Sequence, residues 1–186
     1  THEFTEKLSG ELGLRQGVYA QLGEGKVYQY PGNDPNPDQE PSDSVFYRSA
    51  EVMQRYQGLE PRIAFRYLLR PEFSLKLAYN RNFQYVQIAS NSSAGLPIDR
   101  WVLAGQYNRP IKSDQISLGL FHNFDQNRWE LSVEGYYKNL DHVIDLRNGA
   151  RILLSDQVET ELLSGRGWAY GAEFLLRKNK GKTTGW

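Results

Sequence analysis

The residue types that could support acid–base chemistry are paired carboxylates. Glu130 and Glu134 lie on the same side of a segment that alternates like a strand. A carboxylate pair of this kind could in principle hydrolyse a glycosidic bond. Four steps along a strand separate the two side chains by about 13 Å at ~3.3 Å per residue, beyond the ~5–9.5 Å that a glycosidase pair uses. We therefore predict no catalysis here, and expect both glutamates to pair with Arg or Lys across a sheet.

Metal-ligating residue types are present without a dedicated spacing. His2, His122 and His142 do not show the spacing of a Zn²⁺ site, and the chain has no cysteine. Four carboxylates lie in one polar stretch: Asp34, Asp38, Glu40 and Asp43. They could gather around Ca²⁺, but the stretch lacks the glycine and the ligand order of a dedicated calcium loop. We expect no resident metal or cofactor, with Ca²⁺ in the 34–43 loop as the remaining candidate.

The turn Gly181-Lys182-Thr183 matches the end of a phosphate-binding loop. The first glycine of that motif would stand at position 176, which is Leu176, and the turn follows a strand instead of opening a helix. We expect a solvated turn. Lys plus Arg equal Asp plus Glu at 22 each, so no net field indicates a nucleic-acid partner. These residues predict no enzyme.

Residues 113–138 carry the pattern around which the chain is organised. Trp129, Leu131, Val133 and Tyr137 alternate with polar or charged residues. Side chains on a strand alternate faces with a period of two. Residues 113–124 alternate in the same way before a polar turn, so the pattern predicts a hairpin with one apolar face and one charged face.

The same alternation recurs in six segments. They are residues 7–19, 60–69, 73–87, 113–124, 129–144 and 167–177. Long and short connections follow one another, the long ones being 22–58, 89–110 and 145–165, with a helical turn compatible with 49–57. Alternate connections of an antiparallel meander emerge at the same end, so all long loops share one side. Outer-membrane barrels show this asymmetry, with short periplasmic turns and long extracellular loops. A soluble antiparallel β binding module, with its apolar face packed into a core, remains the alternative.

A barrel wall would assign a role to each face. Its lumen would receive the charges of the polar rows: Glu11, Arg15, Arg62, Arg66, Lys76, Glu130, Glu134, Glu173 and Arg177. The lipid interfaces would receive aromatic residues of the apolar rows: Trp129, Tyr137, Trp168 and Tyr170. Aromatic girdles lie at both edges of the apolar band in such barrels. In a soluble sandwich the tryptophans would instead pack in the core.

Several segments resemble the barrel domain of TonB-dependent outer-membrane receptors. They are LEPRIAFRYLL (59–69), SLKLAYNRNFQYVQIASNSSAGLPIDRWV (74–102), SDQISLGLFHNF with WELSVEGYYKNLDHVID (113–145), and GRGWAYGAEFLLRKNKGKTTGW (165–186). The resemblance runs from about Leu8 to the end. It implies an all-β fold, here an antiparallel meander of about six strands within a transmembrane barrel of about 22 strands. It also implies a place in the bacterial outer membrane and import of iron chelates, cobalamin or glycans, with energy passed through TonB.

Two parts of the family pattern are not matched in these residues: the N-terminal plug with its TonB box, and the terminal strand. We therefore expect residues 1–186 to be an internal part of a receptor, a partial barrel. The smallest transmembrane barrels use about eight strands, and open edges are untenable in lipid. The implied partners are outer-membrane lipid, the remainder of the same barrel with its plug, and the TonB energy-coupling complex. The alternative is a partial barrel held through its strand edges by an assembly protein or a surface lipoprotein.

The long loops would cap the outer mouth of such a barrel. Loops carry binding in scaffolds of this kind. The candidate ligand contacts are the aromatic and polar residues Tyr47, Arg48, Tyr56, Arg100, Trp101, Tyr107 and Arg151. Each of them has packing of loop on loop as its alternative role.

Overall fold

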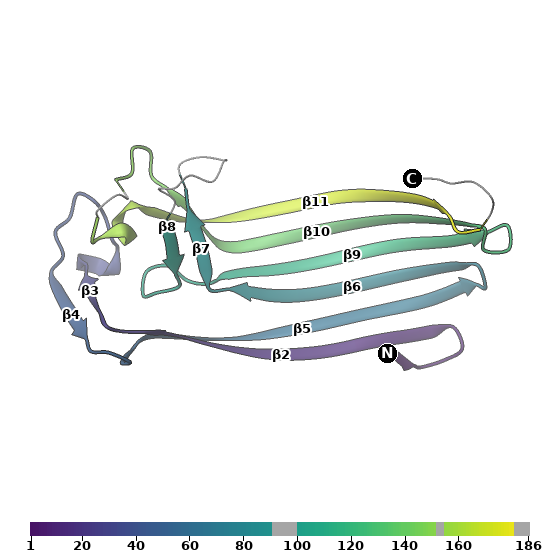
Figure 1. Cartoon of the computed structure of the whole chain (residues 1–186), viewed down its shortest axis with the longest axis horizontal. Coiled ribbons are helices and arrows are strands. Elements are labelled where there is room, and N and C mark those ends of the chain that lie inside the picture. Colours follow the sequence, from purple (N-terminus) through teal and green to yellow (C-terminus); the bar gives the residue numbers. More distant parts are fainter. Residues whose placement is uncertain (91–99, 152–154, 181–186) are drawn as a thin grey trace.

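A computed structural model describes residues 1–90, 100–151 and 155–180 of the chain. One long antiparallel sheet dominates it, with a group of loops at one end (Figure 1). Its seven strands, in spatial order, are β1 (His2–Glu3), β2 (Leu8–Leu22), β5 (Val52–Arg70), β6 (Phe73–Gln84), β9 (Ile111–Phe124), β10 (Trp129–Leu146) and β11 (Leu162–Lys178). The prediction of an all-β antiparallel meander is confirmed. The turn Gly181-Lys182-Thr183 lies outside the described residues.

Most strands reach further towards the loops than their alternation indicated, whereas β6 ends at Gln84 and not at residue 87. β5 begins at Val52, not near residue 60, so the helical turn suggested for 49–57 is wrong. β11 begins at Leu162, not at residue 167. Backbone pairing of β2 with β5 continues as far as Leu22 and Val52. Near the loops, polar residues occupy both faces of these strands. The sequence therefore shows no alternation there, although the backbone hydrogen bonds between the strands continue. The seventh strand, β1, has two residues and is too short to show alternation.

The short connections lie at one end of the sheet and the long connections at the other (Figure 1). The turn between β9 and β10 shows how a short connection closes. Asp125, Gln126 and Asn127 all have positive φ, a conformation that Asp and Asn tolerate better than most residues. The Arg128 amide donates to the Asp125 carbonyl at 2.9 Å, and their side chains form an ion pair at 3.0 Å.

The long connections are more ordered than predicted for 22–58, 89–110 and 145–165. They contain the hairpin β3 (Gly25–Gln29) with β4 (Asp43–Tyr47), the hairpin β7 (Val86–Ala89) with β8 (Arg100–Leu103), and the 3-10 turns η1 (Pro31–Asn33) and η2 (Val158–Glu161). A small apolar cluster joins the second long connection to the third and to the adjoining ends of β10 and β11. It consists of Ala89, Val102, Ile144, Leu146, Ala150 and Leu162. These hairpins are too short to show a clear alternation of polar and apolar residues, so the sequence pattern predicted irregular loops. No helix in the described ranges is long and apolar enough to cross a membrane.

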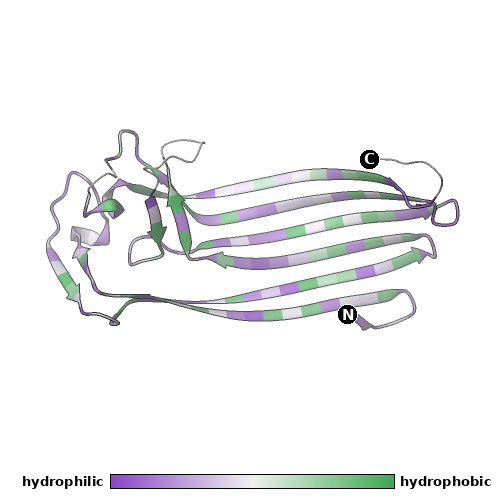
Figure 2. Ribbon diagram, in the orientation of Figure 1, coloured by the Kyte–Doolittle hydropathy of each residue, from purple (hydrophilic) through white to green (hydrophobic). Residues whose placement is uncertain are grey.

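The strand register sorts the side chains onto two faces. Directly opposed residues share a face, and one apolar row crosses six strands: Leu12, Ile63, Tyr79, Ile116, Tyr137 and Tyr170. Figure 2 shows the resulting alternation of hydrophobic and hydrophilic segments along the strands. This face is exposed: Phe174 and Tyr170 are each 75% accessible and Leu14 is 72%. An exposed apolar surface that spans six strands marks a site of contact with lipid or protein.

Candidate functional site

The face opposite the apolar rows carries all nine charges assigned to a lumen. The register pairs Glu130 with Arg177, and the Arg177 Nη2 donates to the Glu130 Oε2 at 2.5 Å. Glu134, in contrast, lies opposite Glu173 and Gly119. The expected pairing of a glutamate with a basic residue across the sheet therefore holds for Glu130, whereas Glu134 faces a like charge.

The most deeply buried charge on this face is Glu60, whose side chain is fully inaccessible. It forms an ion pair with Arg15 across β2 and β5. The ring of Tyr85 stacks on Tyr19 with centroids 4.9 Å apart and planes 3° apart. Among the described atoms, both tyrosine hydroxyls and both Glu60 oxygens are buried without a hydrogen-bond partner.

Two glycines make room for these rings. Gly17 and Gly58 lie opposite each other on β2 and β5. A Cβ atom at Gly58 would lie 2.5 Å from the Phe83 ring, and one at Gly17 would lie 3.1 Å from the Tyr85 hydroxyl. The aromatic side chains at the end of β6, Phe83 within it and Tyr85 just after it, thus lie against the glycine pair, and Gly17 also adjoins the Glu60 carboxylate. Sequence reasoning missed Glu60, because only the register brings Arg15 to it.

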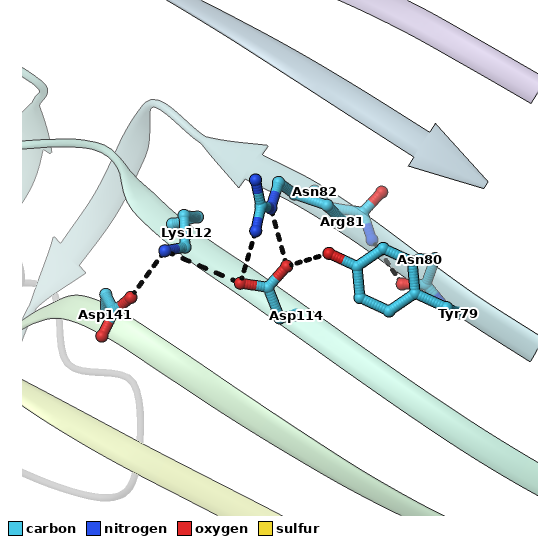
Figure 3. A network of polar contacts seen from close by, with 7 residues as sticks. All are labelled: Tyr79, Asn80, Arg81, Asn82, Lys112, Asp114 and Asp141. Carbon is cyan, nitrogen blue, oxygen red and sulfur yellow. Dashed lines mark hydrogen bonds and ion pairs between the residues drawn. The ribbon is translucent and has the colours of Figure 1, made fainter. Parts of the chain in front are cut away.

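A second polar group lies on the apolar face, at its loop end (Figure 3). Asp114 on β9 is its centre. Arg81 on β6 donates to both Asp114 oxygens, from Nε at 2.7 Å and from Nη2 at 3.2 Å. The Tyr79 hydroxyl donates to the same carboxylate at 2.7 Å. Three cross-strand contacts therefore neutralise and orient one carboxylate.

Lys112 extends this group across two further strands. Its Nζ lies 3.6 Å from Asp114 and 2.9 Å from Asp141 on β10. The Arg166 Nε on β11 lies 3.5 Å from the other Asp141 oxygen. We call these five residues the charged belt: Arg81, Asp114, Lys112, Asp141 and Arg166. These five residues could have been recognised from the sequence, because each is a charged residue at a position that the alternation assigns to the apolar face.

The four interface aromatics predicted from sequence, Trp129, Tyr137, Trp168 and Tyr170, all lie on the apolar face. Trp129 adjoins a short turn and stacks on Phe124 with centroids 6.5 Å apart. Trp168 lies opposite Asn139, so the two tryptophans are separated by about 33 Å along β10 at ~3.3 Å per residue. With the ~40° tilt of barrel strands, that length corresponds to roughly 25 Å, the height of the apolar band in outer-membrane barrels.

At the loop end, the long connections interlock through polar contacts that form a loop cap. Gln29 in the first connection and Gln106 in the second exchange side-chain hydrogen bonds of 3.3 and 3.0 Å. The Tyr107 hydroxyl donates to the Tyr28 carbonyl at 3.0 Å. These contacts join segments that lie more than seventy residues apart, so the first two connections form one unit.

Tyr30 ties the third connection to this loop cap. It is 4% accessible, its hydroxyl donates to the Glu159 Oε1 at 3.0 Å, and its ring meets Tyr107 edge-on at 5.4 Å. Burial raises the pKa of Tyr30 well above its ordinary value, and the Glu159 charge and hydrogen bond raise it further. The hydroxyl therefore stays protonated and keeps its donor role at neutral pH.

The predicted ligand contacts divide into three groups. Tyr56 and Arg100 bind loop backbone: Tyr56 donates to the Gly105 carbonyl at 2.7 Å and Arg100 to the Ser155 carbonyl at 2.8 Å. Tyr107 lines two cavities, one of 330 Å³ and one of 260 Å³, and Arg100 and Trp101 line the smaller. Neither of these cavities is lined by the remaining candidates, Tyr47, Arg48 and Arg151.

The larger cavity is polar and charged. Residues of all three long connections line it, including Asp34, Arg109, Arg147 and Glu159. Over the described ranges no three His, Asp or Glu side chains converge to hold a metal ion. The four carboxylates of residues 34–43 are thus not gathered into such a group, and Ca²⁺ in the 34–43 loop stays a prediction.

The comparisons with known proteins agree with this geometry. The family model described as TonB dependent receptor-like, beta-barrel matches residues 1–186. No curated protein and no solved structure matches the chain. The chain belongs to the TonB-dependent receptor β-barrel family, which consists of outer-membrane transporters and not of enzymes.

Proposed function

We propose that residues 1–186 form part of the wall of a receptor barrel that imports a scarce nutrient of the iron-chelate, cobalamin or glycan class. One observation carries this proposal: a long sheet has one exposed apolar face and one charged face, and its long connections interlock at one end. A wall between lipid and an aqueous lumen requires this two-sided pattern. A soluble sandwich would bury the apolar face, so it does not fit an exposed Phe174.

In this arrangement the apolar face contacts lipid, with Trp129 at the periplasmic interface and Trp168 at the outer one. The nine charged residues of the other face line the lumen. The loop cap lies at the extracellular mouth, where the charged cavity beside Tyr107 is available to a polar ligand.

The open edges of the sheet support a proposal for the partners of the wall. Within the described residues, β11 pairs with β10 only, and its other edge offers unpaired backbone groups. Such an edge cannot face lipid. We assign it to the remainder of the same barrel, which would enclose a plug coupled to TonB. The second candidate for this edge is an assembly protein that adds a strand to it.

Cysteine labelling tests the orientation, because the chain contains no cysteine of its own. We would place single cysteines at Arg151 in a long connection and at Gln126 in a short turn, and treat intact cells with an impermeant maleimide. Arg151→Cys should react at once, and Gln126→Cys only after the outer membrane is opened. The reverse order would overturn the orientation.

Bromolipid quenching tests the wall itself. The receptor would be reconstituted in bilayers with brominated acyl chains, and its tryptophan fluorescence recorded. Quenching should diminish in Trp129→Phe and in Trp168→Phe, with Trp101→Phe as the control in the loops. Emission that brominated lipid leaves unchanged would contradict lipid contact.

Uptake measurements test the import function. Cells that carry or lack the receptor would be given a radiolabelled ferric chelate, labelled cobalamin or a fluorescent oligosaccharide. Receptor-dependent uptake of one probe, abolished when TonB is deleted, supports the proposal. No receptor-dependent uptake of any of the three would reject the proposed nutrient classes.

A further inference from the structure

The charged belt begins where the apolar face ends. The last complete apolar row near the loops contains Tyr79, Ile116, Tyr137 and Tyr170. In the next two rows the register places Arg81 opposite Asp114, Lys112 opposite Asp141, and Asp141 opposite Arg166. Strands β6 and β9 therefore change from apolar to charged side chains in the first of these rows, and β10 and β11 in the second.

Charged groups at this height cannot lie among acyl chains, because burying a charge in hydrocarbon is costly. The belt thus marks the level of the lipid headgroups. Along the series of ion pairs the signs alternate, with Arg81 at one end, Lys112 in the middle and Arg166 at the other end. Three cations and two carboxylates leave the belt with a net positive charge.

The two arginines keep donors that their ion pairs do not use. Arg166 pairs with Asp141 through Nε, and its side chain is 85% accessible, so both of its terminal amino groups are left for another acceptor. Arg81 uses Nε and Nη2 on Asp114, which leaves Nη1. Guanidinium groups match phosphate oxygens in geometry and charge.

We propose that the charged belt binds phosphate groups of lipid headgroups in the outer leaflet. This inference rests on the proposed orientation of the wall. Arg81 and Arg166 contact the phosphates, and Asp114 and Asp141 hold the three cations in place. Each carboxylate is already neutralised by two cations, which favours direct contact with phosphate over a headgroup bridged by a divalent metal.

Native mass spectrometry of the receptor in detergent tests this directly. Dioleoyl phosphatidic acid and dioleoyl phosphatidylcholine share acyl chains and differ at the phosphate-bearing headgroup, so their adducts would be compared. The double variant Arg81→Gln/Arg166→Gln should lower phosphatidic acid affinity by about fivefold or more. The loss for phosphatidylcholine should be smaller, because its phosphate is a diester neutralised by choline. The matched control Arg66→Gln/Lys76→Gln removes two cations from the opposite face and should leave both affinities unchanged.

Three results would overturn the inference: equal phosphatidic acid affinity in wild type and the belt variant, an equal loss in the control variant, or loss of wild-type binding in EDTA, which would mean a metal bridge. Inorganic phosphate would be added at about 10 mM, a concentration roughly tenfold above a dissociation constant of about 1 mM. Displacement of the lipid by this phosphate would mean a free-anion site instead of a lipid site. Quenching of Trp168 by bromolipid, measured in parallel, keeps the two proposals separate. If Trp168 is quenched and the belt variant binds normally, only the belt inference fails; if Trp168 is not quenched, the wall orientation fails with it.

Discussion

The two faces of the sheet hold ion pairs of the same chemistry in opposite surroundings. In the charged belt, Asp114 is partly accessible and has three partners, Arg81 and Tyr79 on β6 and Lys112 on its own strand. On the other face, Glu60 is fully buried and has one cationic partner, Arg15. An exposed ion pair contributes little to stability, whereas removing one partner of a buried pair leaves an uncompensated charge. The comparison shows that burial, not the number of contacts, decides what a charge costs when its partner is lost.

The largest effect is expected for Arg15→Met. This change leaves the Glu60 carboxylate buried without a cation. Because Arg15 itself is 59% accessible, the free energy of unfolding should fall by about 3 kcal/mol, the lower end of the range for buried pairs. Urea unfolding of the receptor in detergent micelles, followed by tryptophan fluorescence, measures it.

The double variant Arg15→Met/Glu60→Gln is the control, because it also removes the stranded charge. It should recover most of the lost stability. A cost below about 1 kcal/mol for Arg15→Met alone would mean that water reaches Glu60, and the contrast between the faces would disappear.

An intermediate effect is expected in the loop cap, for Tyr30→Phe. The substitution removes a buried donor from the Glu159 carboxylate, and should cost about 1.5–3 kcal/mol locally. Hydrogen exchange of the hairpin formed by β3 and β4, and of η2, should accelerate together, because Tyr30 joins them. Tyr28→Phe is the matched control, since Tyr28 contributes its backbone carbonyl to the cap and not its hydroxyl.

The raised pKa of Tyr30 adds a test by pH. Its stabilisation is fully present below the ordinary tyrosine pKa of about 10, and is lost as the pH rises through the higher value of the folded state. Above a pH of about 10, the wild-type loop cap should therefore lose protection against hydrogen exchange as Tyr30 ionises. The Tyr30→Phe variant should not show this additional loss. The same alkaline response in both proteins would argue against this assignment.

The smallest effect is expected for Asp114→Asn in the charged belt. Arg81 and Tyr79 keep an oxygen acceptor and have access to headgroups and water, so the loss should be about 1 kcal/mol. Asp125→Asn, at the exposed ion pair with Arg128, is the control and should change stability by less than about 0.5 kcal/mol. A loss at Asp114 as large as that at Arg15 would show that Asp114 is as shielded from water as Glu60.

The strands and their faces could be predicted from sequence because side-chain alternation is a local property. Trp129, Leu131 and Val133 identify their face without knowledge of any partner strand. The loop cap could not be predicted in this way. Residues 25–29 and 43–47 form a hairpin too short to display a period, and Gln29 meets Gln106 only after the sheet has brought their connections together.

The amino-acid sequence by itself determined the all-β meander, the division into an apolar and a charged face, and the separation of short turns from long connections, since all three follow from spacing along the chain. Tertiary structure alone decided which charges meet. Arg15 reaches Glu60, Lys112 bridges Asp114 and Asp141, and Tyr30 reaches Glu159 through strand register and loop packing. The contacts between strands depend on register, since a one-residue change would move Arg15 or Asp141 to the other face. The contact of Tyr30 with Glu159 depends on how the long connections pack.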